Sequence, residues 1–185
     1  MARVRLAGVT PAASPSIPYD IVYGSKGPQM SRTDTTPTAS VAQAKELQVV
    51  VGSILYYARA ADPRMLEAVS FLSCLQSNPT TLVMAKMERL LGYASAHADA
   101  QLIIHSPDML LTIFSDASFN SRPNSKSVAG GYHFLGRRRD PDFLNAPIPS
   151  ICATIPVACA AVSEAEYGGV FVNYQAAVEE RTSSA

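Results

Sequence analysis

Residues 109–118 read MLLTIFSDAS, and this stretch decides how the second half of the chain is interpreted. Its first six residues are an apolar run, which is typical of a β-strand buried on both faces. Asp116 follows the run directly. A carboxylate at the end of a buried strand is costly to desolvate unless a metal ion or a hydrogen-bond donor compensates it. Two interpretations stay open: Asp116 caps the turn after the strand, or it holds a divalent metal ion.

Further strand patterns lie on both sides of this stretch. Residues 102–104 (LII) form a short apolar run before it. Residues 127–135 (SVAGGYHFL) predict a strand whose two glycines mark a bulge or a close backbone approach. His133 in this strand and His105, which follows residues 102–104, are both expected to be hydrogen-bonded structural histidines. Residues 148–157 predict a last strand, which is interrupted by two prolines.

The C-terminal part of the chain predicts a helix that begins at Ser163 and runs to about Glu180. Ser163 and Glu166 have the Ser-x-x-Glu spacing of a capping box, in which the glutamate reaches back to the backbone N–H of the serine. Glu164 in the same turn suits the positive end of the helix dipole. On the residues alone, Glu166 is therefore interpreted as a helix cap.

Upstream of the strands, apolar residues recur at helical spacing in three segments. Their inward faces are Leu47, Val50, Val51, Ile54, Leu55 and Ala58; then Leu66, Val69, Leu72 and Leu75; then Val83, Met87, Leu90, Leu91 and Ala94. Asp62-Pro63 and Asn78-Pro79 separate the segments, with Asp62 as an N-cap before proline at the first helical position. These patterns predict a small antiparallel bundle.

Three domains follow from these patterns. Residues 1–44 hold five of the 13 prolines and many serines and threonines, so they predict an extended, poorly ordered arm. Residues 45–98 carry the three helical segments. Residues 99–185 carry the predicted strands and the last helix.

Composition limits the kinds of partner. Lys and Arg number 15 and Asp and Glu number 15, so the chain lacks the excess of positive charge with which proteins grip nucleic acid alone. The three cysteines are in no C-x-x-C pair, which predicts free thiols in a reducing compartment. Since no apolar run is long enough for a signal peptide or a membrane span, we expect an intracellular protein, cytoplasmic or nuclear, without a membrane partner.

The motifs resemble a known family when they are taken in order. Residues 51–60 (VGSILYYARA), followed by Asp62-Pro63, and residues 87–93 (MERLLGY) resemble the C-terminal thumb or connection segment of the reverse transcriptase in copia-type LTR retrotransposon Pol polyproteins. SDAS at residues 115–118, SVAGGY at 127–132 and SEAEY at 163–167 resemble the N-terminal half of that family's ribonuclease H. The arm, with Pro18-Tyr19 and residues 22–24, is similar to the linker before these helices. The resemblance covers about residues 17–178.

The resemblance implies an α+β fold: a small helical bundle followed by a partial ribonuclease H-like mixed sheet with at least one packed helix. It implies a metal-dependent endonuclease that degrades the RNA strand of an RNA–DNA hybrid with Mg²⁺, or with Mn²⁺ as the alternative ion. Asp116 and Glu166 match the family's first two catalytic carboxylates and metal ligands. The metal role of Glu166 competes with capping, because one side chain cannot fully do both.

The sequence also departs from the family pattern. The family's third carboxylate lies on the strand after the first helix, whereas this sequence ends at Ala185. Glu179 lies about 20 Å along the helix from Glu166, at about 1.5 Å per residue, and so cannot complete the same site. The polymerase palm is absent too. We therefore expect a polyprotein fragment that is inactive alone.

Several partners follow from these expectations. In the complete polyprotein they are an RNA–DNA hybrid or a template–primer duplex. A partial sheet also leaves an exposed edge through which copies of the chain can associate. The alternative hypothesis is a non-catalytic nucleic-acid or protein interaction module derived from a retroelement.

Overall fold

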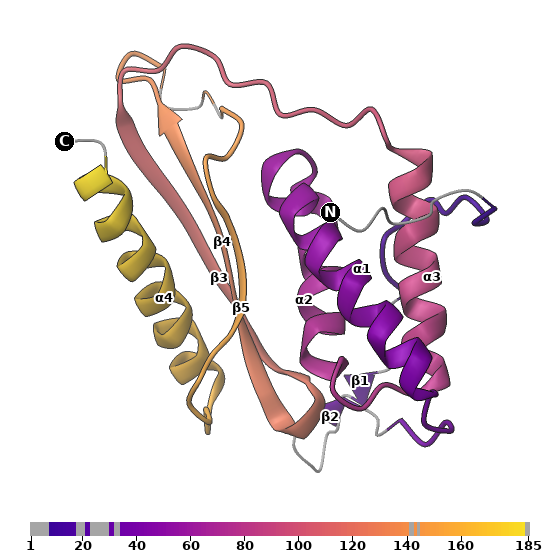
Figure 1. The fold of residues 1–185 in the computed structure, drawn as a ribbon. Helices are drawn as coiled ribbons and strands as arrows, with labels where there is room; N and C mark the ends of the chain where they lie inside the picture. Colours follow the sequence, from indigo (N-terminus) through magenta and orange to yellow (C-terminus); the bar gives the residue numbers. More distant parts are fainter. Residues whose placement is uncertain are drawn as a thin grey trace. The chain divides into compact units, whose positions relative to one another are not determined.

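The computed structural model describes residues 8–17, 21–22, 30–31, 34–140, 143 and 145–183. The chain divides into two units, which are described separately (Figure 1). The helical unit comprises Met1–Tyr19 and Thr33–Gln101, and the sheet unit comprises Asp20–Arg32 and Leu102–Ala185. The fold is therefore α+β, as predicted.

The described residues of the helical unit form three α-helices and a short 3-10 helix. They are α1 (Val41–Ala60), η1 (Pro63–Met65), α2 (Leu66–Leu75) and α3 (Thr81–Ala96). Helix α1 begins earlier than predicted because Ser40 forms a capping box with Gln43. The predicted apolar faces form the core, and its fully buried members include Leu47, Ala58, Val69 and Leu90.

An ion pair between the buried Asp62 and the exposed Arg64 holds the joint between α1 and α2. The carboxylate of Asp62 accepts from the backbone N–H of Arg64 at 3.2 Å and from two guanidinium nitrogens at 2.7 and 2.9 Å. The predicted N-cap role of Asp62 is thus confirmed, and the hydrogen bond to Asp62 raises the pKa of Arg64. Burial, together with the negative charge of Asp62, raises the pKa of Tyr57 and of Tyr93.

Residues 34–40 belong to the segment that was predicted to be a poorly ordered arm. They are extended, but they are hydrogen-bonded to the residues just before α3. Ala39 donates its backbone N–H to the carbonyl of Pro79 at 2.9 Å, and Thr81 donates to the carbonyl of Pro37 at 2.9 Å. The prolines exclude a helix here, but their carbonyls remain acceptors. This part of the arm therefore belongs to the helical unit.

The other described part of the arm in this unit, residues 8–17, lies against α3. A Cβ atom on Gly92 would lie 2.2 Å from the carbonyl oxygen of Thr10, so this close approach requires glycine inside the helix. Arg89 donates from Nη2 to the hydroxyl of Ser14 at 2.7 Å. The backbone contact explains a glycine that would otherwise weaken α3 by about 1 kcal/mol relative to alanine.

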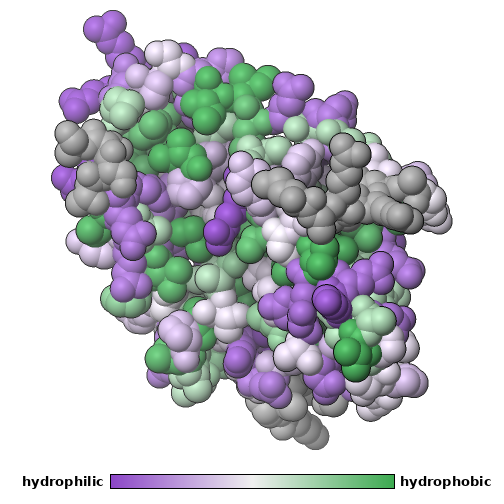
Figure 2. Space-filling model, in the orientation of Figure 1, coloured by the Kyte–Doolittle hydropathy of each residue, from purple (hydrophilic) through white to green (hydrophobic). Residues whose placement is uncertain are grey.

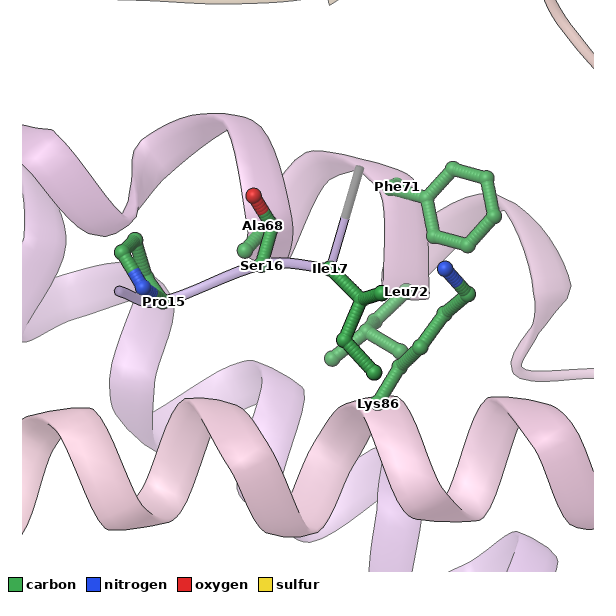
Figure 3. Close-up of a pocket in the computed structure, with 7 residues that line it drawn as sticks. All are labelled: Pro15, Ser16, Ile17, Ala68, Phe71, Leu72 and Lys86. Carbon is green, nitrogen blue, oxygen red and sulfur yellow. The ribbon is translucent and has the colours of Figure 1, made fainter. Parts of the chain in front are cut away.

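A small apolar pocket lies where this segment meets α2 and α3 (Figure 3). Pro15 and Ile17 of the segment line it together with Phe71 and Leu72 of α2. The ammonium of Lys86 lies 5.4 Å from the centre of the Phe71 ring. The pocket has a volume of about 10 Å³, which is room for a single water molecule at most. It is therefore a packing feature rather than a ligand site.

The sheet unit contains an antiparallel sheet in the order β3 (Leu110–Arg122), β4 (Lys126–Gly136) and β5 (Ser150–Thr154). Pairing of β3 with β4 is continuous from Leu110 opposite Gly136 to Ser118 opposite Val128. The two prolines that interrupt the last predicted strand lie outside β5, which confines that strand to five residues.

A second pair of strands, β1 (Ile21–Val22) and β2 (Met30–Ser31), is also antiparallel. All described strand pairs are therefore antiparallel, and the mixed sheet expected from the resemblance is not seen in the described residues. Pro18, Tyr19 and residues 23–24, which entered the resemblance, lie outside the described residues.

Two strand predictions were wrong. Residues 102–104 are not a strand, and Ile103 and Ile104 are exposed; the side chain of Asn145 instead takes both backbone hydrogen bonds of His105, at 2.8 Å each. Strand β3 is not buried on both faces, because Leu110 and Phe114 are exposed. A run of apolar letters does not reveal whether one face or two will be covered.

Helix α4 (Val162–Ser183) lies along one face of this sheet (Figure 1). Its buried residues are spaced four apart, and they are Ala165, Gly169, Asn173 and Ala177. Ala165 packs with Ala129 of β4 and with Ile155 in a small core. Neither α4 nor another helix in the described part of the chain is long and apolar enough to cross a membrane.

Candidate functional site

The first predicted site residue, Asp116, lies inside β3 rather than at its end. It is opposite Gly130 of β4, and the strand continues six residues beyond it to Arg122. Asp116 is exposed, so it does not bear the desolvation cost that the sequence suggested. The prediction that it caps a turn after the strand was wrong, because its backbone is part of a regular ladder.

The second predicted site residue, Glu166, lies in the second turn of α4 and is half-buried. The helix begins at Val162, one residue before Ser163, so Ser163 is inside the first turn. The carboxylate that caps the start of the helix is that of Glu164, which accepts from the backbone N–H of Ala160 at 2.7 Å. The predicted capping box of Ser163 and Glu166 was therefore wrong.

Alternation along β3 determines where the carboxylate of Asp116 points. The hydroxyl of Ser115 accepts from Asn173 of α4 at 3.1 Å. A Cβ atom on Gly169 of α4 would lie 3.2 Å from the methyl group of Ala117. Both neighbours of Asp116 thus face α4, and successive side chains of a strand point to opposite faces. Asp116 therefore points away from the helix that carries Glu166.

This arrangement does not fit a shared metal site. A two-carboxylate magnesium site requires both groups on one side, with their oxygens a few ångströms apart. Asp116 thus lies on the face of β3 that α4 does not cover, whereas Glu166 is carried by α4.

The polar centre of this contact is Asn173, which the sequence analysis missed. Its Nδ2 donates to the carbonyls of Gly169 and Gly130, at 2.8 and 3.0 Å, as well as to Ser115. Its Oδ1 lies 3.0 Å from Nε2 of His133. Since the amide nitrogen is directed at carbonyl oxygens, Oδ1 acts as the acceptor, and His133 carries a proton on Nε2.

His133 is fully buried, and its other ring nitrogen faces Glu180. Nδ1 lies 2.8 and 3.0 Å from the two carboxylate oxygens of Glu180. Both ring nitrogens of His133 therefore have a partner on α4. The prediction of a structural, hydrogen-bonded histidine is confirmed, and the cluster joins the far half of α4 to β4.

Gly131 leaves the space that this cluster occupies. A Cβ atom there would lie 1.7 Å from Oδ1 of Asn173. The two glycines were predicted to mark a bulge or a close approach, and the close approach is the one observed. The register is continuous past both, and the irregularity lies further on, between Ser118 and Arg122. The sequence did contain a signal for Asn173. It is the one polar residue on a helix face that otherwise consists of Ala165, Gly169 and Ala177.

A further buried polar group lies at the turn between β3 and β4. Asn120, Arg122 and Ser127 are buried, and the backbone N–H of Asn120 donates to the hydroxyl of Ser127 at 3.2 Å. Asn120 and Asn124 have positive φ angles of 49° and 61°, which asparagine tolerates better than most residues. The role of this group is to shape the turn.

Three consecutive arginines, residues 137–139, follow β4 directly. They form a turn that is closed by a bridge between Arg137 and Asp140. Arg137 donates to the carbonyl of Ser106 at 3.3 Å and lies 4.1 Å from the centre of the Phe143 ring. Its guanidinium is thus used in contacts within the sheet unit.

Comparison with protein-family models, with curated proteins and with solved structures gave no match for this chain.

Proposed function

We propose that the chain is part of a copia-type retrotransposon polyprotein, acting inside the cell. In this proposal the helical unit derives from the reverse transcriptase thumb or connection segment, and the sheet unit derives from the start of its ribonuclease H domain. The complete enzyme would degrade the RNA strand of RNA–DNA hybrids. The 185-residue chain itself would not cleave.

One observation carries the proposal: the motifs occupy elements in the order that the resemblance implies. Residues 51–60 and 87–93 lie in α1 and α3. SDAS lies in β3, SVAGGY lies in the neighbouring β4, and SEAEY lies in the first turns of the helix packed on these strands. Five motifs in one order are a more specific signal than any single motif.

The alternation of side chains along β3 is the reason why we expect no cleavage by this chain. Asp116 points away from α4, the helix that carries Glu166, and we infer from this that the two carboxylates do not hold metal ions together. Hydrolysis of a phosphodiester by this class of enzyme depends on metal ions held by clustered carboxylates. The magnesium requirement therefore remains a prediction for the complete enzyme, and no catalytic step is assigned to this chain.

The test is cleavage of a labelled RNA–DNA hybrid by the purified chain, in Mg²⁺ and separately in Mn²⁺. Asp116→Asn and Glu166→Gln are the site variants, and Glu88→Gln on α3 is the matched control. We expect the wild-type chain to cleave no faster than the two site variants. Cleavage that both site substitutions abolish and Glu88→Gln retains would contradict the claim of inactivity and would support the family assignment.

The alternative function is a non-catalytic interaction module. The zero net charge favours a protein partner over nucleic acid within this alternative. Fluorescence anisotropy of a labelled template–primer duplex, measured at increasing salt concentration, distinguishes a nucleic-acid partner from a protein partner. Affinity that falls steeply with salt would identify a nucleic-acid module, and an absence of binding would leave protein partners.

Self-association is a further way in which the chain could find a partner. Strand β3 is at the edge of the three-stranded sheet, with β4 as its neighbour, so its other edge is a surface through which copies could pair.

A further inference from the structure

The surface of α4 that faces away from the sheet is unusually apolar. Tyr167, Phe171 and Tyr174 are 77%, 59% and 67% exposed, and Val170 among them is also exposed. They follow one another at spacings of three and four residues, so they form one stripe along the helix. We call Tyr167, Val170, Phe171 and Tyr174 the outer stripe. Hydrophobic residues are also visible among polar ones along the side of the sheet unit where α4 runs (Figure 2).

The outer stripe does not belong to the sheet contact. The residues that face the sheet are Ala165, Gly169, Asn173 and Ala177, which lie on the other side of the helix. Small residues thus cover the inner face and large aromatic residues cover the outer face, which is the reverse of an ordinary surface helix. Large apolar residues that are exposed in a row on a helix mark a site where another surface binds.

The stripe also carries no charge. Residues 167–178 read YGGVFVNYQAAV and contain no Asp, Glu, Lys or Arg. Nucleic acid is a poor occupant, because phosphates are bound by positive side chains. Two copies of an uncharged stripe, in contrast, meet without like-charge repulsion.

The spacing of the stripe is self-complementary. If two α4 helices pack antiparallel about a two-fold axis between Val170 and Phe171, Tyr167 of one copy faces Tyr174 of the other. Val170 then faces Phe171, and each pair occurs twice, as a two-fold interface requires. The helix dipoles of such a pair run in opposite directions, which is the favourable arrangement.

The area is large enough for a dimer of modest affinity. An aromatic side chain presents about 200 Å², so the exposed parts of the three rings amount to roughly 400 Å² on each copy. A standard interface buries about 800 Å² per partner, and weak complexes bury less than about 600 Å². The stripe therefore supplies the centre of an interface, and the side chains beside it supply the rim.

We propose that the outer stripe is a dimerisation surface, and that its partner is the α4 helix of a second copy of this chain packed antiparallel. This inference rests on the exposure and spacing of the stripe and does not depend on the proposed function. It differs from pairing through the edge of β3, because it uses side chains of a helix rather than backbone groups of a strand.

The first test is the mass of the full chain by sedimentation equilibrium over a wide range of concentration. We expect the wild-type chain to shift from monomer to dimer as concentration rises, and Phe171→Gln and Tyr174→Gln to remain monomeric. Tyr56→Gln is the matched control, because Tyr56 is a 74% exposed aromatic residue on α1. It should dimerise like the wild type, and far-UV circular dichroism should be the same for all four proteins.

A second test fixes the geometry. Cys74, Cys152 and Cys159 are replaced by serine, and a single cysteine is then introduced at Val170, beside the proposed axis. This chain should form a disulfide-linked dimer under mild oxidation, whereas a single cysteine at Tyr56 should not. A cysteine at Tyr167 alone should cross-link slowly, and cysteines at Tyr167 and Tyr174 together should cross-link fast.

Three results would overturn the proposal. The first is a wild-type chain that stays monomeric at every concentration. The second is a dimer that persists in both Phe171→Gln and Tyr174→Gln. The third is a dimer that is lost in Ser118→Lys but retained in the two stripe variants. Because Ser118→Lys places a charge on the exposed side of β3, that result would show that the chains associate through the strand edge.

Discussion

The two units of this protein are stabilised by different kinds of interior. In the helical unit the buried side chains are almost all apolar, and the largest of them include Leu47, Met65, Leu72 and Leu90. In the sheet unit the apolar cluster is small, and much of the interior is polar, with Arg122, His133 and Asn173 among its largest fully buried side chains. Burial of apolar area is non-directional, whereas a buried hydrogen-bond network depends on every partner. The units should therefore respond differently to substitution.

The largest expected effect is in the apolar interior. Leu90→Ala should lower the free energy of unfolding by about 3 kcal/mol, since it removes a fully buried side chain and leaves a cavity. Denaturant unfolding followed by far-UV circular dichroism measures it. The control is Leu82→Ala on the same helix, where the side chain is 40% exposed. Equal losses for the two variants would show that α3 is not packed as described.

The next effect concerns the polar interior. Asn173→Ala should cost about 2 kcal/mol, because it removes the partner of the buried Nε2 of His133 and one donor to the carbonyl of Gly130. Faster hydrogen exchange at the amides of β4 is the most local readout. Gln175→Ala, at an exposed position of the same helix, is the control. If both variants exchange alike, the network does not hold α4 to the sheet.

Two glycines sharpen the comparison, because the same change should have opposite signs in the two units. Gly131→Ala should destabilise by about 1–3 kcal/mol, since the added methyl group would overlap Asn173. Gly52→Ala in α1 meets nothing within 4 Å and should stabilise by up to about 1 kcal/mol. Thermal unfolding of both variants measures the difference. A stabilising Gly131→Ala would mean that α4 does not approach β4 this closely.

The smallest effect is a pH dependence in the helical unit. Tyr57 and Tyr93 have raised pKa values in the folded chain, mainly because they are buried. A raised pKa means that the unfolded chain loses these protons first, so stability is complete below about pH 10 and declines as the pH rises above it. Tyr57→Phe should make this alkaline decline shallower in a pH series of denaturant unfolding. An unchanged slope would show that Tyr57 is not buried in this way.

The helices could be predicted because the signal is local. The apolar spacing and the joints at Asp62-Pro63 and Asn78-Pro79 predicted all three helices of the helical unit. Only the start of α1 differs from the prediction, because Ser40 caps the helix together with Gln43. The strands were harder. Ser115, Asp116, Ala117 and Ser118 are small or polar, so the apolar run stops at Phe114 although the strand continues to Arg122. Pairing with β4 extends it, and pairing is not a local property.

The candidate site could be predicted only in part, for the same reason. The sequence placed Asp116 near a strand and Glu166 near a helix start, and both elements are present. It could not indicate which face of β3 the helix covers, and that choice decides whether the two carboxylates meet. Asn173 and His133 are 40 residues apart, so the cluster they form depends on the packing of α4.

The most direct test of the central claim, that Asp116 and Glu166 lie on opposite sides of the sheet, is Mn²⁺ binding followed by electron paramagnetic resonance. The wild-type chain, Asp116→Asn and Glu166→Gln would be titrated under the same conditions. If the claim holds, the three proteins bind Mn²⁺ equally weakly, because neither substitution removes a shared site. Tight binding by the wild type that each single substitution abolishes would show that the two carboxylates hold one ion, and would contradict the claim.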